Sequence, residues 1–142
     1  MTNRVISTLM WVLGALDVVN GIAMFFAPGA WFFQLVPGVP ETGSFNAHLV
    51  QDSGTFFLAV GIGLIAGAPD PARNAIVVLV AAIASAMHSI LHIYSHAAGL
   101  LSMQHMGTEA FGIYLPTIVL IAMTVMLLWR PREVVMAHPK TA

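Results

Sequence analysis

The stretch NAIVVLVAAIASAMHSILHIYSH, residues 74–96, is the part of the sequence that decides the fold. It is apolar for long enough to cross a bilayer as a helix, which takes about 20 residues. It also carries His88, His92 and His96, which are spaced four residues apart and so share one helical face. The stretch therefore predicts a transmembrane helix with a row of imidazoles along its second half.

Three more apolar stretches of similar length surround it, at about residues 7–26, 46–66 and 112–129, with Pro and Gly in the breaks. The sequence thus predicts an all-α fold, a four-transmembrane-helix bundle that forms a single integral membrane domain over residues 1–142. The aromatic segment at 30–36 is too short to cross, so we expect a short interfacial segment between the first and second spans.

The composition supports this class of protein. Hydrophobic residues make up 58% of the chain and charged residues only 8%, whereas soluble domains carry about 25% charged residues. The net charge of −1 provides no basic surface for nucleic acid, and the absence of cysteine excludes thiolate metal sites and disulfides. The expected partner is therefore the lipid bilayer.

The basic residues predict the orientation of the bundle. With four crossings, all five fall on one side of the membrane: Arg4, Arg73, Arg130, Arg132 and Lys140. Basic residues concentrate on the cytoplasmic side of membrane proteins. We therefore expect both termini in the cytoplasm and the protein in the bacterial inner membrane.

The polar residues of different spans fall at matching depths. With a rise of about 1.5 Å per residue, Asp52 and His88 lie at one level, and His48 and His92 lie one turn farther from the cytoplasm. Ionisable groups are costly against lipid, so we expect these four to converge on a metal ion. The expected surrounding shell and rim are Asp17, Asn20, His96, His105 and Glu109.

Imidazole and carboxylate are good ligands for copper, zinc and iron, so the predicted function is the binding of a transition metal or a metal-containing cofactor. Haem b held by His48 and His92 is an alternative, although small residues near them are more simply explained by helix packing. The competing hypothesis is a non-catalytic assembly subunit whose polar cluster is an interhelix hydrogen-bond network. A proton path is a further alternative, but the cytoplasmic half of the second and third spans lacks polar residues.

Two features leave the chemistry open. The segment with Met103, His105 and Met106 suits a soft metal such as Cu(I), but nine methionines occur in the chain and methionine also packs well among helices. No Gly-x-Ser-x-Gly, phosphate-loop or His-Glu-x-x-His motif occurs, so no catalytic residue is assigned and enzymatic activity stays open.

The sequences GSFNAHLVQDSG at 43–54 and MHSILH at 87–92, in a four-span layout, resemble the small four-helix DoxX-like bacterial membrane proteins. Some members of that group are linked to quinone-coupled oxidoreductases. The resemblance implies a redox context and no particular reaction. We expect the chain to act as an accessory subunit of a larger membrane oxidoreductase complex or as a homo-oligomer. It assigns no catalytic residue.

Overall fold

The computed structural model describes residues 3–129, and within that range it contains helices and turns but no strand. Three long helices are α1 (Asn3–Phe26), α3 (Ala47–Gly67) and α4 (Ala75–Ala97), and the fourth runs from Met103 to Leu128. Each is long and apolar enough to cross a membrane, which confirms the prediction of an all-helical chain with four candidate spans. Arg130, Arg132 and Lys140 lie outside the described residues.

The fourth helix starts nine residues before the predicted boundary at 112. It is assembled from the 3-10 turn η3 (Met103–His105), α5 (Met106–Glu109), the π-helical turn η4 (Ala110–Tyr114) and α6 (Leu115–Leu128). Pro116 lacks an N–H and would clash with the carbonyl group four residues before it in a regular α-helix. The wider π turn lies directly before this proline, so the helix continues through it.

The short segment predicted at 30–36 is helical. It comprises α2 (Pro28–Ala30) and the π turn η1 (Trp31–Leu35), and the 3-10 turn η2 (Val39–Thr42) follows before α3. Trp31 Nε1 donates a hydrogen bond of 2.8 Å to Asn20 Oδ1 of α1. This bond folds the segment back against the end of α1.

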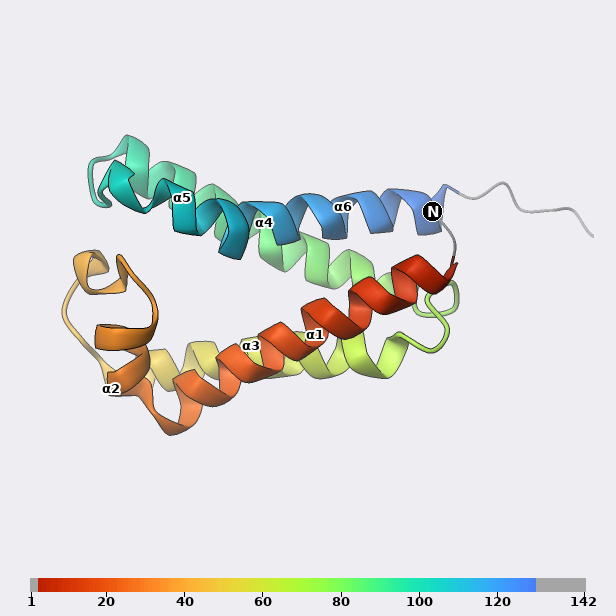
Figure 1. Cartoon of the computed structure of the whole chain (residues 1–142), viewed down its shortest axis with the longest axis horizontal. Coiled ribbons are helices and arrows are strands. Elements are labelled where there is room, and N and C mark those ends of the chain that lie inside the picture. Colours follow the sequence, from red (N-terminus) through yellow and green to blue (C-terminus); the bar gives the residue numbers. More distant parts are fainter. Residues whose placement is uncertain (1–2, 130–142) are drawn as a thin grey trace, which may run out of the picture.

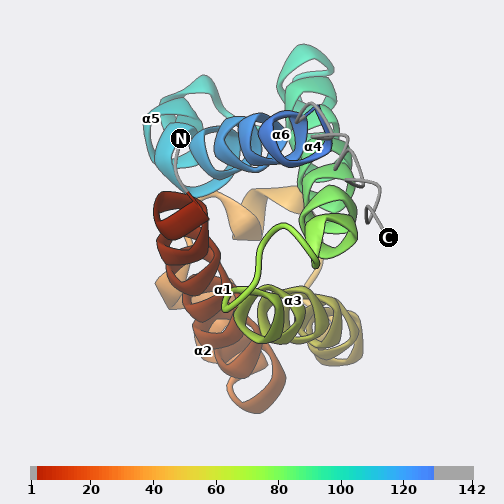
Figure 2. The ribbon, with the colours of Figure 1, turned by 90° about the vertical axis from the view of Figure 1, so that its right-hand side faces the viewer.

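The long helices form two antiparallel pairs, α1 with α3 and α4 with α6 (Figures 1 and 2). The pairs meet where α1 begins, and they diverge toward the end that carries α2 and α5 (Figure 1). The largest side chains of the shared core are fully buried and come from all four helices: Ile6, Met10, Leu64, Val78 and Met123.

Four glycines bring the backbones of α1 and α3 into direct contact. A methyl group added at Gly14 would lie 2.8 Å from the carbonyl oxygen of Gly61, and one added at Gly21 would lie 2.8 Å from that of Gly54. The glycines of each helix are seven residues apart, about two turns, and so lie on one face. Small residues at such spacing are typical of close helix packing in membranes.

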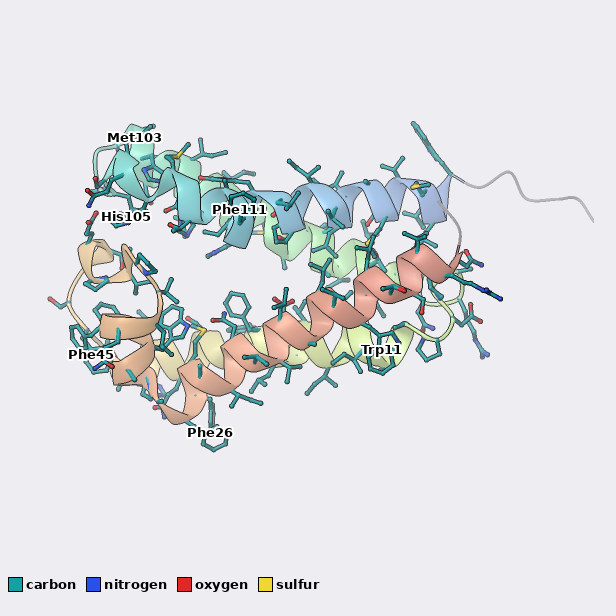
Figure 3. The ribbon with its side chains drawn as sticks, in the orientation of Figure 1. Trp11, Phe26, Phe45, Met103, His105 and Phe111 are labelled. Atoms are coloured by element: carbon teal, nitrogen blue, oxygen red, sulfur yellow. The ribbon has the colours of Figure 1, made fainter. Side chains whose placement is uncertain are left out.

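The outward faces are strongly apolar. Exposed fractions reach 77% for Phe26, 72% for Phe56 and 76% for Phe111, and Phe26 points away from the bundle (Figure 3). In water such a surface would be unusual for a monomer of this size. These faces are compatible with direct contact with a bilayer.

We predict that Gly61→Ala destabilises the fold by about 1–3 kcal/mol, the usual cost of overpacking a tight contact. The new methyl group would lie 2.7 Å from the Gly14 carbonyl oxygen, which forces the helices apart. The measurement is unfolding in detergent followed by circular dichroism. Gly63→Ala on the same helix is the control, because its methyl group meets only Val77 Cγ1 at 3.4 Å. Equal effects of the two substitutions would contradict the prediction.

Candidate functional site

A buried carboxylate, that of Glu109, is the centre of the polar cluster between α4 and the fourth helix. Glu109 is 8% exposed. Its Oε1 lies 3.1 Å from His92 Nδ1 and its Oε2 lies 2.7 Å from His96 Nε2. The Tyr114 hydroxyl also points to Oε2, at 3.4 Å. One carboxylate thus contacts two imidazoles from successive turns of α4.

The local sequence explains how these groups meet. His92 and His96 share a face of α4 because they are four residues apart. The helix ends at a turn in which Gly99 has φ +70° and the Leu100 N–H donates to the Ser95 carbonyl at 2.8 Å. Only glycine adopts this left-handed conformation easily, and such residues commonly end helices. The turn reverses the chain and returns Glu109 to α4.

The hydrogen bonds of His96 fix how many protons it shares with Glu109. His96 Nδ1 lies 3.3 Å from the Leu101 carbonyl oxygen, which can only accept, so Nδ1 carries a proton. His96 Nε2 then either donates to an ionised Glu109 or accepts from a protonated one. In both forms the pair has no net charge and holds one shared proton, which suits apolar surroundings.

The hydrogen-bonding groups of His92 are paired less completely than those of His96. Its Nδ1 is buried and lies 3.1 Å from Glu109 Oε1, but the direction of that contact is not that of a hydrogen bond. Within residues 3–129 this nitrogen has no hydrogen-bond partner. A buried imidazole nitrogen without a partner is unusual and leaves a lone pair or a proton available for another ligand.

His88 extends the row of imidazoles toward the middle of the bundle. Its ring packs edge-to-face on the His92 ring, with centroids 4.7 Å apart, and lies 6.2 Å from the ring of Phe57 on α3. Below it, hydroxyl groups connect α4 to α6, with Thr117 Oγ1 lying 2.6 Å from Ser85 Oγ and 2.8 Å from Ser89 Oγ.

The structure divides the four predicted ligands into two groups. His88 and His92 belong to the cluster described above. His48 Nε2 lies 3.4 Å from Asp52 Oδ2, and these side chains are 85% and 56% exposed. Asp52 lies on the outward face of α3. Gly54 faces α1, and Asp52 is two residues from it, which is a rotation of about 200° around the helix axis. His48 and Asp52 therefore contact each other and are not gathered around His92.

The predicted surrounding residues are also distributed over several contacts. His96 and Glu109 are in the cluster itself, and Glu109, expected only at the rim, is its centre. Asn20 is used to hold Trp31, and its Nδ2 lies 3.6 Å from Met24 Sδ. Asp17 packs at the α1–α3 contact, where its Cβ lies against Gly61. Tyr114 is not one of the predicted site residues, but its hydroxyl lies 3.4 Å from Glu109 Oε2.

His105 makes a separate contact that connects the two helix pairs. Its Nε2 lies 2.8 Å from Glu41 Oε1, and the Ser102 N–H donates to Glu41 Oε2 at 3.0 Å. We call this contact the Glu41–His105 clasp, and Figure 3 shows His105 facing the loop before α3. Gly38, with φ +86°, lies under the His105 ring, where a Cβ would come within 3.1 Å of the ring carbons. The hydrogen bond from His105 holds the pKa of the Glu41 carboxyl below its ordinary value of 4.5.

The chain matches no family model, no curated protein and no solved structure. The resemblance to DoxX-like proteins therefore stays a prediction. Among residues 3–129, no three His, Asp or Glu side chains are arranged around a common point as in a preformed metal site.

We predict that the Glu41–His105 clasp weakens in acid. Because the folded-state pKa of Glu41 is lowered, its stabilising contribution is present above the ordinary value of 4.5 and is lost as the pH falls through the folded-state pKa. The melting temperature of the wild type should therefore fall more than that of Glu41→Gln between about pH 6 and pH 3, the range over which carboxylates titrate. Parallel curves for the two proteins would show that the clasp does not contribute.

Proposed function

We propose that this protein binds a transition metal ion in the membrane through His92, His96 and Glu109. The observation that carries the proposal is the buried Glu109 carboxylate, which contacts two imidazoles of α4 within 3.1 Å. Two imidazoles and one carboxylate form a ligand set used by zinc, copper and iron. His88, beside His92, is the adjacent imidazole.

His92, His96 and Glu109 lie close together but are not preformed around one point, so an ion would have to draw them together. His92 Nδ1 is buried without a hydrogen-bond partner in the described range, and a metal ion would satisfy it. At His96, the ion would replace the proton shared between Nε2 and Glu109 Oε2. A bound ion supplies a redox-active or Lewis-acidic centre, while Tyr114 and the Leu101 carbonyl orient the groups around it. Haem b does not suit the arrangement, because His48 lies on the exposed face of α3.

A second candidate function is supported by the hydrogen bonds themselves. Ser85, Ser89 and Thr117 join α4 to α6 without any ion, and the 2.7 Å contact of His96 with Glu109 continues the same seam. Polar contacts between membrane helices contribute about 0.6 kcal/mol each on average. A non-catalytic assembly subunit would use this network only to hold its helices together.

We predict that the purified full-length protein binds one Co(II) or Zn(II) ion per chain. Co(II) is followed by its visible absorption and Zn(II) by calorimetry. His92→Ala, His96→Ala and Glu109→Gln should each weaken binding more than about tenfold, because loss of even an outer-shell partner costs 10- to 100-fold.

The matched control is His48→Ala with Asp52→Asn, since it removes an imidazole and a carboxylate that contact each other on the exposed face of α3. Its metal affinity should equal that of the wild type. Affinity that is absent in the wild type, or unchanged in Glu109→Gln, would exclude the metal site. If Glu109→Gln then lowers only the melting temperature, the assembly network is the better account.

We also propose that both termini face the cytoplasm and that the α2–α5 end faces outward in a bacterial inner membrane. The start of α1, with Arg4, and the α3–α4 connection, with Arg73, lie at one end of the molecule (Figure 1). Basic residues favour the cytoplasmic side. The role of accessory subunit in a membrane redox complex rests on the DoxX-like resemblance.

The orientation is testable because the chain contains no cysteine. Thr42→Cys and Ala72→Cys each introduce one thiol at an exposed position, at opposite ends of α3. A membrane-impermeant maleimide added to intact spheroplasts should label the Thr42→Cys protein, and it should label the Ala72→Cys protein only after permeabilisation. The reverse pattern would invert the proposed topology.

A further inference from the structure

An open cleft of about 470 Å³ lies at the α2–α5 end, beside the His92–Glu109 cluster. It is lined by Ile93, His96, Ala97, Met103, Met106 and Tyr114. Two of these residues, His96 and Tyr114, also contact Glu109 on its buried side. The cleft therefore lies against His96, a member of the cluster whose side chain is 6% exposed.

Met103 and Met106 share the wall of this cleft. They are three residues apart where η3 continues directly into α5, and residues at that spacing lie on one side of a 3-10 helix. Figure 3 places Met103 at the extreme α2–α5 end of the molecule. Both thioethers thus border one space together with the His96 ring.

Their exposure separates these methionines from the methionines of the core. Met103 is 64% exposed and Met106 is 39% exposed, whereas Met10, Met24 and Met123 are at most 3% exposed. A packing role explains the buried ones, because methionine fills gaps between helices. Met87 on α4 is also exposed, at 66%, so Met103 and Met106 differ from it in one respect: both line one cleft together with a histidine.

We propose that Met103 and Met106, together with His96, form a binding site for the soft monovalent ion Cu(I). Thioether sulfur is a soft ligand that selects Cu(I) over Zn(II), Mg²⁺ or Ca²⁺, and imidazole completes many copper sites. Both ring nitrogens of His96 are engaged, Nδ1 with the Leu101 carbonyl and Nε2 with Glu109, so Cu(I) would bind Nε2 by displacing the proton that the pair shares. The Glu109 carboxylate then remains beside the ion as the nearby negative group. The site binds the ion without any change in its oxidation state.

This inference rests on the proposed function in one respect, because His96 is common to both sites. It names copper as the metal and the methionine cleft as its point of entry. The methionines are not ligands in the site proposed for His92, His96 and Glu109, so substitutions of the methionines separate the two proposals.

The test is Cu(I) affinity of the full-length protein in detergent, measured anaerobically by competition with a chromophoric Cu(I) chelator. Met103→Leu with Met106→Leu removes both sulfurs and keeps the apolar volume, so the fold is expected to persist. Cu(I) binding should weaken by at least about tenfold. Changing an outer-shell partner of a metal already costs 10- to 100-fold in affinity, and the loss of two direct ligands should cost no less. Co(II) binding should not change.

Met87→Leu is the matched control, because Met87 is 66% exposed on α4 and does not line the cleft. It should leave Cu(I) and Co(II) affinity unchanged, and melting temperatures check that all variants are folded. If the double variant unfolds, the single substitutions at Met103 and Met106 replace it, and each should weaken Cu(I) binding.

The possible failures are distinguishable. Unchanged Cu(I) affinity in the double variant overturns the methionine site and leaves the Co(II) result, and with it the proposed function, untouched. Equal losses of Cu(I) and Co(II) in a folded double variant also overturn it, because the cleft would then lack selectivity for a soft ion. Methionine-dependent Cu(I) binding in a protein that binds no Co(II) supports the methionine site alone.

Discussion

Backbone contact between α1 and α3 is the constraint on which the arrangement of the polar residues depends. Gly14 lies against Gly61 and Gly21 against Gly54, with no room for a methyl group at any of the four. In a membrane, helices gain little from burying apolar side chains against one another, so close backbone packing is a main source of association. This contact leaves α3 only one rotation about its own axis.

The rotation of α3 decides the fate of its polar residues. With Gly54 and Gly61 facing α1, the opposite face of the helix carries Asp52 and Phe56, both exposed. Asp52 then contacts His48, one turn away on the same face. Within residues 3–129, the hydrogen bonds and ion pairs of the cluster at Glu109 come from α4, the fourth helix and the turn between them.

The sequence predicted some of this arrangement well. The long apolar stretches predicted four candidate spans, and the spacing of four placed His88, His92 and His96 on one face of α4. Rise per residue gives only the depth of a side chain along a helix. It gives no rotation about the axis, so matching depths for His48 and His92 did not imply contact.

Two contacts, Glu109 with His96 and Glu41 with His105, could not be predicted from the depth of residues along a helix or from their helical spacing. Glu109 reaches His96 because the fourth helix begins at Met103 and because Gly99 reverses the chain. The sequence did contain an indication of this pairing, since Glu109 is the one acidic residue between His96 and Trp129. Glu41 pairs with His105 across 64 residues of sequence, and nothing local in either loop indicates that pairing.

Charge balance connects the cluster to the kind of ion that it suits. The His96–Glu109 pair is neutral with its one shared proton. A divalent ion that displaces this proton adds one net positive charge, whereas a monovalent ion adds none. Because an uncompensated charge is costly at this depth, the exchange of a proton for a monovalent ion is the less costly of the two. In the proposed Cu(I) site, the thioethers at the mouth of the cleft suit the same soft ion of low charge. His96 belongs both to the buried pair and to the wall of the cleft, so the proton count and the sulfur chemistry bear on one proposed binding region.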